Sequence, residues 1–333
     1  MSSYAQSQVG GKYIFDFLNS PTGSRITALG GSLISVVDDD ITLAFQNPAV
    51  GNQSMDDKLS FNHIFHFSGI SEGHIGYGYN LDSLGIHLHG GFQYVSYGNF
   101  LETNEIGIVN GEFKANEVAL IFGGSKKMND RISVGVSTKF IFAGYAGYNG
   151  WGMAVDGGVI YQVPDKNWTL GLVLQNVGFS NSQFDSENLN LPFDVKLGYS
   201  NKLKYLPFRY TITAQQFHRW NLDPDDPNAP LILNFLGEVV EENQFSEQID
   251  NFFRHFIFSG EFLLGKKELL RLRFAYNHLR KQQLKLETFR SLGGFSFGFG
   301  IKIKRFRLDY GLGYYHIAGA TNHVGINFLI NRK

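Results

Sequence analysis

The sequence alternates apolar and polar residues over long stretches, and this period of two constrains the fold more than any other feature. One example is the run 295–303, in which Phe and Ile residues alternate with Ser, Gly and Lys. Successive side chains of an extended chain point to opposite faces, so such a run predicts a β-strand with one apolar and one polar face. Similar runs cover 59–67, 132–142 and 306–314.

Two architectures fit strands of this kind. A soluble β-sandwich buries the apolar faces, whereas a membrane barrel turns them to lipid and its polar faces to the lumen. The strands run for about ten residues or more, which is the length that spans a bilayer when tilted. Their polar faces hold many Gly residues and full charges, and aromatic residues lie towards the strand ends, as at Trp151, Tyr161, Trp168, Tyr199, Tyr276 and Tyr314. These features favour the membrane barrel.

Fourteen strands are predicted, an even number that is typical of single-chain bacterial barrels. Their ranges are 59–68, 72–80, 84–95, 116–125, 130–142, 151–162, 168–177, 193–202, 207–217, 256–264, 269–278, 292–303, 306–316 and 322–330. The fold prediction is therefore an all-β, 14-stranded antiparallel transmembrane β-barrel with an N-terminal plug (hatch) in its lumen. We expect residues 1–57 to form a lead and the plug, and residues 58–331 to form the barrel.

The links between the predicted strands alternate in length. Short links follow the even-numbered strands, and long links at 96–115, 178–192, 218–255 and 279–291 follow odd-numbered ones. This asymmetry is typical of periplasmic turns and extracellular loops. Loop 218–255 is the longest, and we expect it to contact a protein partner through exposed apolar residues at Trp220, Leu236 and Phe252. A helix that only covers the barrel mouth is the alternative.

Composition excludes several classes of protein. The net charge of −1 gives no electrostatic reason to bind nucleic acid. The absence of cysteine removes disulfides, thiolate catalysis and cysteine-ligated metals. The sequence lacks the long apolar run of a membrane-spanning helix. Residues 1–11 are polar and show no signal peptide, so we expect the chain to be a mature form.

The early stretch 19–49 does not alternate like the rest of the chain. The carboxylates of Asp38, Asp39 and Asp40 are expected to cap a short helix over Ile41–Gln46, which Asn47-Pro48 would end. A cation site at these acids is the less favoured interpretation. Arg25 is the only positive charge between Lys12 and Lys58. Inside a lumen it should pair with a carboxylate, because an unpaired buried charge is destabilising.

This stretch carries a family resemblance. The segments Ala28-Leu-Gly30-Gly31, Asp38–Asp40 and Asn47-Pro48-Ala49 resemble, in order, the hatch signature of FadL-like outer-membrane transporters of long-chain fatty acids. Within that superfamily, the amino-acid sequence of residues 10–50 is similar to that of the PorQ family of the type IX secretion system. The remainder of the chain agrees with this family only in length, strand count and loop pattern. One departure is the end of the chain, Ile330-Asn-Arg-Lys333, because many such barrels end in an aromatic residue.

The resemblance implies a non-catalytic outer-membrane protein of an attachment complex, with its long loops extracellular. That complex processes secreted cargo and attaches it to lipopolysaccharide, and PorZ is the partner most expected, with PorU and PorV. The alternative is a FadL-like transporter of small hydrophobic molecules such as fatty acids. Inward faces rich in Gly, Ser and charge argue against an apolar lumen pocket.

Few motifs suggest other chemistry. Gly69-Ile-Ser71-Glu-Gly73 matches the G-x-S-x-G pattern of hydrolases, but it lies between two predicted strands and lacks the helix that this chemistry needs. His87 and His89 share a strand face without an assignable third ligand, so no metal or cofactor site is predicted. A basic stripe is predicted in the lumen, where it would pair with the plug or hold an anionic ligand, at Arg271, Arg273, Lys302, Lys304 and Arg307.

Overall fold

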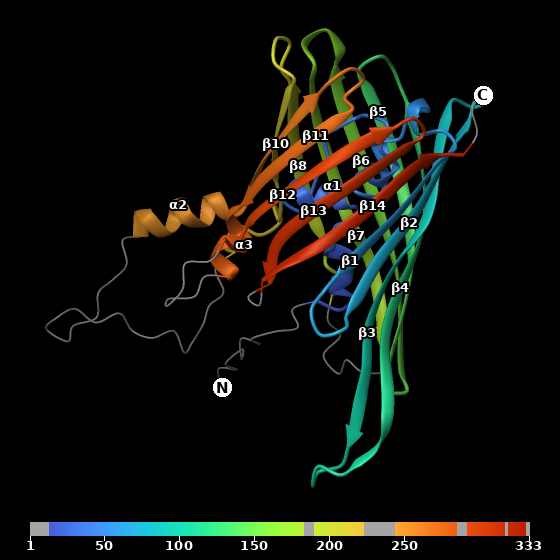
Figure 1. The fold of residues 1–333 in the computed structure, drawn as a ribbon, viewed down its shortest axis with the longest axis vertical. Coiled ribbons are helices and arrows are strands. Elements are labelled where there is room, and N and C mark those ends of the chain that lie inside the picture. Colours follow the sequence, from blue (N-terminus) through green and yellow to red (C-terminus); the bar gives the residue numbers. More distant parts are fainter. Residues whose placement is uncertain (1–12, 183–189, 223–243, 285–291, 317–318, 331–333) are drawn as a thin grey trace, which may run out of the picture.

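The chain forms a closed barrel of 14 antiparallel strands in sequence order, with β1 hydrogen-bonded to β14 (Figure 1). The computed structural model describes residues 13–182, 190–222, 244–284, 292–316 and 319–330. The strands are β1 Lys58–Phe65, β2 Ser71–Leu81, β3 Ile86–Thr103, β4 Val109–Lys127, β5 Ile132–Tyr145, β6 Tyr148–Val163, β7 Trp168–Ser182, β8 Asp194–Lys202, β9 Phe208–Ala214, β10 Phe256–Leu264, β11 Leu270–Asn277, β12 Phe295–Ile303, β13 Phe306–His316 and β14 Gly319–Leu329. The predicted fold class of a 14-stranded antiparallel barrel is confirmed.

Short helices make up the rest of the regular structure. Those before the barrel are η1 Asp16–Asn19, α1 Ser24–Ala28, η2 Ile41–Phe45, η3 Pro48–Val50 and η4 Gln53–Met55. Those between strands are η5 Pro164–Lys166, α2 Gln244–Arg254 and α3 His278–Gln283. Among the described residues, no helix combines the length and the apolar character needed to cross a membrane.

The largest departure from the predicted strands is at β3 and β4. Residues 96–115 were predicted to be a loop, but most of them extend these two strands into a hairpin that projects beyond the barrel (Figure 1). Cross-strand pairing explains the extension, since Phe100 lies opposite Phe113 with ring centroids 5.3 Å apart. Polar residues such as Asn99 and Glu112 interrupt the apolar alternation there, which is why the sequence pattern indicated a loop.

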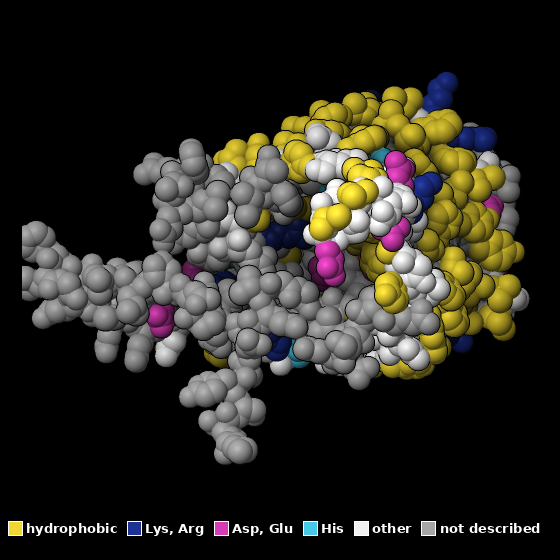
Figure 2. All heavy atoms as spheres, turned by 90° about the horizontal axis from the view of Figure 1, so that it is seen from below, with side chains coloured by type: hydrophobic (Ala, Val, Ile, Leu, Met, Phe, Trp, Pro, Cys, Tyr) yellow, Lys and Arg dark blue, Asp and Glu magenta, His cyan; other side chains and the backbone are white. Residues whose placement is uncertain are grey.

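The barrel carries its apolar side chains on the outside. Along β12, Phe297 and Phe299 are 42% and 43% exposed, whereas the intervening Ser296 is fully buried. Figure 2 shows hydrophobic side chains covering the outer wall. Aromatic rings form a row across neighbouring strands near the short turns, through Tyr161, Trp168, Tyr199 and Tyr210. An outer apolar face bordered by aromatic residues is the surface that a lipid bilayer requires.

The N-terminal segment, residues 13–57, lies inside the barrel (Figure 1). Its helix α1 contacts β11 to β14 and β1, and η3 contacts β4, β5 and β6 on the opposite wall. Ile26, Ile41, Leu43 and Met55 are fully buried. This short segment therefore supplies much of the apolar core, and the inward faces of the strands surround it.

Inward-facing glycines let the backbone of this segment approach the wall. A Cβ at Gly171 of β7 would lie 2.5 Å from the carbonyl oxygen of Ile34, and one at Gly158 of β6 would collide with the side-chain oxygen of Asn47. By contrast, the neighbouring Gly157 has open space where a Cβ would lie. The glycines that the sequence places on the polar strand faces are thus sites of close approach.

We predict that Gly158→Val will weaken the packing of the N-terminal segment, because the added side chain must displace Asn47. Overpacking of this kind destabilises by about 1–3 kcal/mol. The unfolding midpoint and the rate of limited proteolysis within residues 13–57 measure the effect. Gly157→Val is the matched control on the adjacent position of the same strand. Equal shifts for the two variants would contradict the proposed close approach.

Candidate functional site: the lumenal ion-pair network

The Gly30–Gly31 pair ends α1 and turns the chain. Both residues have positive φ angles, 91° and 96°, and the Gly31 N–H donates to the carbonyl of Ile26 at 2.9 Å. A side chain at Gly30 would collide with Ile257 of β10. Glycine is therefore required here both by conformation and by space.

Asn47 and Pro48 shape the next turn. The Asn47 side chain accepts a hydrogen bond from the N–H of Ala49 at 3.0 Å and donates to the carbonyl of Ile34 at 2.8 Å. It caps η3, in which Pro48 occupies the first turn, where its missing N–H is harmless. The buried Asn47 side chain thus joins two parts of the N-terminal segment.

Only one of the three consecutive acids caps a helix. Asp40 accepts hydrogen bonds from the N–H and hydroxyl of Thr42 at the start of η2, a 3₁₀-helix over Ile41–Phe45. The expected capping role of Asp38 and Asp39 is wrong, because their carboxylates make ion pairs with the wall instead. Among the described residues, no group of three or more His, Asp or Glu side chains is arranged to hold a metal ion.

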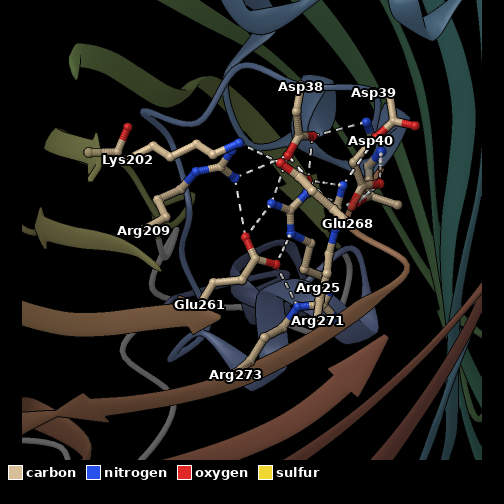
Figure 3. A network of polar contacts seen from close by, with 12 residues as sticks. Arg25, Asp38, Asp39, Asp40, Lys202, Arg209, Glu261, Glu268, Arg271 and Arg273 are labelled. Carbon is tan, nitrogen blue, oxygen red and sulfur yellow. Dashed lines mark hydrogen bonds and ion pairs between the residues drawn. The ribbon is translucent and has the colours of Figure 1, made fainter. Parts of the chain in front are cut away.

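Arg25 is the centre of these ion pairs (Figure 3). Its Nη2 lies 2.8 Å from Asp38 Oδ2 and 2.8 Å from Glu261 Oε2 of β10, and its Nη1 lies 3.3 Å from Asp40 Oδ2. The Arg25 side chain is 1% exposed. Arg25 therefore has the carboxylate partners that a buried charge was expected to need. Asp38 and Asp40 belong to its own segment, and Glu261 belongs to the wall.

Basic residues of the wall close around the acids of the segment. Arg209 of β9 lies 3.2 Å from both Asp38 and Glu261, and Arg271 of β11 lies 3.7 Å from Asp38. Sequence reasoning did not single out Arg209, although its place between Phe208 and Tyr210 in a strand marks it as an inward-facing charge.

A second group of contacts surrounds Asp39. Its carboxylate lies 2.7 Å from Lys58 Nζ, 3.0 Å from Lys302 Nζ and 3.1 Å from Arg307 Nη1. Arg307 also reaches Asp40 at 2.8 Å. The N-terminal segment is therefore fastened to β1, β12 and β13 by charge-assisted hydrogen bonds, the stronger kind.

The predicted basic stripe divides into three parts. Arg271, Lys302 and Arg307 pair with acids of the N-terminal segment. Arg273 instead pairs within the wall, 2.8 Å from Glu261 and 2.7 Å from Asp309. The placement of Lys304 in the lumen is wrong: it is exposed in the β12–β13 turn with a φ of 55°, because β12 ends at Ile303.

The charges in this network hold one another ionised. Burial acts to lower the pKa of Arg25, but Asp38, Glu261 and Asp40 outweigh burial and raise it well above its ordinary value. Burial likewise acts to raise the pKa of Asp38, but Arg25, Arg271 and Arg209 hold it well below its usual range. In both groups the neighbouring opposite charges therefore favour the charged form.

Histidines lie at another point of contact between the segment and the wall. The ring of Phe45 meets those of His74 and His89 edge to face, at centroid distances of 4.3 and 5.2 Å. His87 lies on the same inward face as His89, as predicted, and its Nδ1 is 2.7 Å from Asn80 Oδ1.

Ser71 opens β2 without a following helix, which leaves the hydrolase pattern without its required context.

Among the described residues, β7 and β8 pair along only part of the length of β7. Pairing of β7 with β8 stops at Gln175–Asp194, while β6 continues to pair with β7 as far as Ser182. At the break, Asn176 has a φ of 58°, donates from its side chain to the carbonyl of Pro192 and accepts from Lys139 Nζ at 2.7 Å. A cavity of about 570 Å³ lies here, lined by Tyr13, Asn176, Val177, Gly178, Asn190, Leu191, Phe193, His218 and Arg219.

Two of the three residues expected to contact a partner lie at the long-loop end, in the described parts of the 218–255 connection. Trp220 is 66% exposed and its ring centroid lies 6.4 Å from that of Phe252 on α2. Asn251 fixes this pair by donating to the carbonyl of Trp220 at 2.8 Å. Asp250 of α2 lies 2.8 Å from His278 of α3. Leu236 lies outside the described residues.

We predict that Arg25→Met will destabilise the protein by about 1–3 kcal/mol, because Asp38, Asp40 and Glu261 lose the charge-assisted contacts of their shared partner while Arg209, Arg273 and Arg307 keep them paired. Arg25→Lys should be intermediate, since a lysine keeps the charge but not the forked geometry. Urea unfolding in detergent measures the free energy of unfolding of both variants. The control is Lys127→Met, which removes an exposed ion pair to Asp130 at 3.4 Å and should leave the midpoint unchanged. Arg25→Met behaving like the control would contradict the central role of Arg25.

Comparisons with known proteins extend the description of the fold. No protein-family model matches the sequence, and no curated protein matches it. Solved structures do match along nearly the whole chain. The CymD monoaromatic hydrocarbon channel has a TM-score of 0.58 at 12% identity, covering 94% of this chain and 98% of that one.

Two toluene transporters are similar to this chain in the same way. TbuX of Ralstonia pickettii has a TM-score of 0.53 at 12% identity, covering 93% of this chain and 98% of that one. TodX of Pseudomonas putida has a TM-score of 0.52 at 14% identity, covering 92% and 96%. The chain thus shares its fold, over more than nine tenths of its length, with these three barrels.

Proposed function

We propose that this protein is an outer-membrane channel for small hydrophobic molecules and that its N-terminal segment closes the lumen in the structure described. The apolar outer wall supports a place in a bilayer, and the asymmetry of turns and loops supports extracellular long loops. The whole-length likeness to channels for toluene and other monoaromatic hydrocarbons supports the class of substrate by analogy of fold. Catalysis forms no part of the proposal.

The break between β7 and β8 is the observation that carries this proposal. A hydrophobic molecule has no need of a water-filled pore, because it can pass between the lumen and the lipid through the side of a barrel. The cavity at the break combines apolar groups at Val177, Leu191 and Phe193 with the aromatic ring of Tyr13 from the N-terminal segment. Asn176, Asn190, His218 and Arg219 add polar groups to the same lining, and small-molecule sites combine apolar walls with polar groups that orient the ligand.

Transport through the barrel then requires the N-terminal segment to move. The segment fills the barrel at the level of Arg25, where charged side chains occupy the centre of the lumen. Those ion pairs set the free-energy difference between the closed and open arrangements. A substrate opens the channel only if it binds the open arrangement more tightly than the closed one.

We predict that a disulfide between the segment and the wall will stop transport. A Cβ at Gly198 of β8 would lie 2.9 Å from the Cβ of Ser35, so Ser35→Cys with Gly198→Cys can form the bond after a shift of about 1 Å. The natural chain has no cysteine to compete. Uptake of labelled toluene by cells carrying the oxidised double variant should fall to the level of cells without the protein, and a reductant should restore it.

The two single-cysteine variants control for the substitutions themselves. Mass spectrometry of the purified protein verifies that the disulfide has formed. Equal uptake before and after reduction, with the disulfide present, would rule out transport that depends on movement of the segment.

The exposed aromatic surface of α2 supports a second candidate. Trp220 and Phe252 lie together on the long-loop side, which is unusual for a surface that meets only water. In this second candidate function, the barrel is a scaffold of a type IX secretion attachment complex. The surface formed by Trp220 and Phe252 would bind PorZ, and PorU and PorV would belong to the same complex. A lumen closed by ion pairs suits a scaffold, which has no need to open.

We expect a photoreactive residue at Trp220 to distinguish the two candidates. In intact outer membranes, a scaffold should give crosslinks from Trp220 to PorZ or one other surface protein. The control position is Tyr205, which is 89% exposed in the turn at the opposite end of the barrel. Crosslinks to lipid alone from Trp220 would exclude the scaffold role and leave α2 as a helix resting on the membrane.

A further inference from the structure

A cationic pocket lies at the short-turn end of the barrel. It has a volume of about 710 Å³ and is bounded by the β10–β11 and β12–β13 turns, the end of β14 and the start of β1. Neither the proposed transport of hydrophobic molecules nor the binding of a partner at the long-loop end uses it. Its position, charge and lining separate it from both.

The floor of this pocket has more positive than negative charge. Lys58, Lys302 and Arg307 all reach the single carboxylate of Asp39. The wider network has a cation surplus too, with Arg25, Lys58, Lys202, Arg209, Arg271, Arg273, Lys302 and Arg307 against Asp38, Asp39, Asp40, Glu261, Glu268 and Asp309. An anion in the pocket would therefore offset charge that the protein leaves unbalanced.

The rim adds further positive charge. Lys266 and Lys267 come from the β10–β11 turn, and Lys304 and Arg305 come from the β12–β13 turn. All four are exposed, and within the described part of the chain none has a carboxylate within 4.0 Å. Four exposed cations on adjacent turns at one edge create a positive potential that attracts anions to the pocket.

The outer side of the same pocket is apolar. Ile303 and Phe306 are exposed on the outer wall, and Leu269 is exposed in the β10–β11 turn. The ring of Phe306 stacks on that of Phe328, with ring centroids 5.9 Å apart. These residues line the pocket together with the cations. A ligand that covers both parts must have an anionic head and an apolar body that extends along the outside of β12, β13 and β14.

We propose that this pocket binds the phosphate headgroup of an anionic phospholipid in the leaflet at the short-turn end. The phosphate lies among the rim cations and above the ammonium groups of Lys58 and Lys302, and the acyl chains lie against Phe306 and Ile303. A free phosphate ion satisfies the cations but leaves the apolar wall uncovered. A zwitterionic phospholipid covers the wall but brings its own positive charge to the cations.

The test measures lipid binding to the full-length protein in detergent by native mass spectrometry. Phosphatidylglycerol is titrated against phosphatidylethanolamine of the same acyl chains, and inorganic phosphate is added as a competitor. The test variant carries Lys266→Gln, Lys267→Gln, Lys304→Gln and Arg305→Gln, which leaves every contact of Asp39 intact. We expect the natural protein to prefer phosphatidylglycerol and the variant to bind it at least about tenfold more weakly.

A matched control removes the same number of charges from other exposed positions at the same end, two of them at the end of β4 and two in turns. It carries Lys126→Gln, Lys127→Gln, Lys166→Gln and Lys204→Gln, all at exposed positions. This control should bind phosphatidylglycerol as the natural protein does. Equal weakening in both variants, or no preference between the two lipids, would overturn the proposal. Full displacement by millimolar inorganic phosphate would overturn it too, because the site would then hold a free anion.

Discussion

The structure depends on the ion pairs of one buried arginine. Arg25 stands in a lumen whose walls are polar because the outer faces of the strands must be apolar. A charge in that position is tolerated only if carboxylates surround it, and Asp38, Asp40 and Glu261 do so. Glu261 belongs to the wall and the two aspartates to the segment, so satisfying Arg25 also places the segment.

Steric fit and charge act together in this arrangement. Inward glycines such as Gly158 and Gly171 bring the backbone of the segment against the strands, and this closeness lets side chains on both sides reach one another. The network is consequently short-range and largely shielded from solvent, where charge-assisted hydrogen bonds are strong. The same closeness explains why so small a segment can fill the inside of a barrel.

From the long-loop end to the short-turn end, the barrel has three regions that differ in chemistry. The long-loop end exposes aromatic rings beside α2 and holds the cavity at the β7–β8 break, whereas the ion-pair network around Arg25 lies deeper in the lumen. The short-turn end gathers lysines and arginines above an apolar edge. A barrel wall keeps these regions at fixed heights, so each can meet a different environment: surface, hydrocarbon and headgroup.

The sequence by itself determined the barrel, because a period of two over long strands has few stable solutions, and it determined that Arg25 needs acidic partners. Strand positions such as β10, Phe256–Leu264, were also predictable from the alternation alone. Only the tertiary structure decided which carboxylates meet Arg25, since the position of the N-terminal segment inside the barrel brings Arg25 to Glu261 across 236 residues. It also decided that Asp38 and Asp39 pair with the wall, that Lys304 lies in a turn, and that β7 leaves β8 at Asn176. These outcomes depend on how the N-terminal segment lies against the wall and on where neighbouring strands stop pairing, and the alternation of residues within one strand carries no information about either.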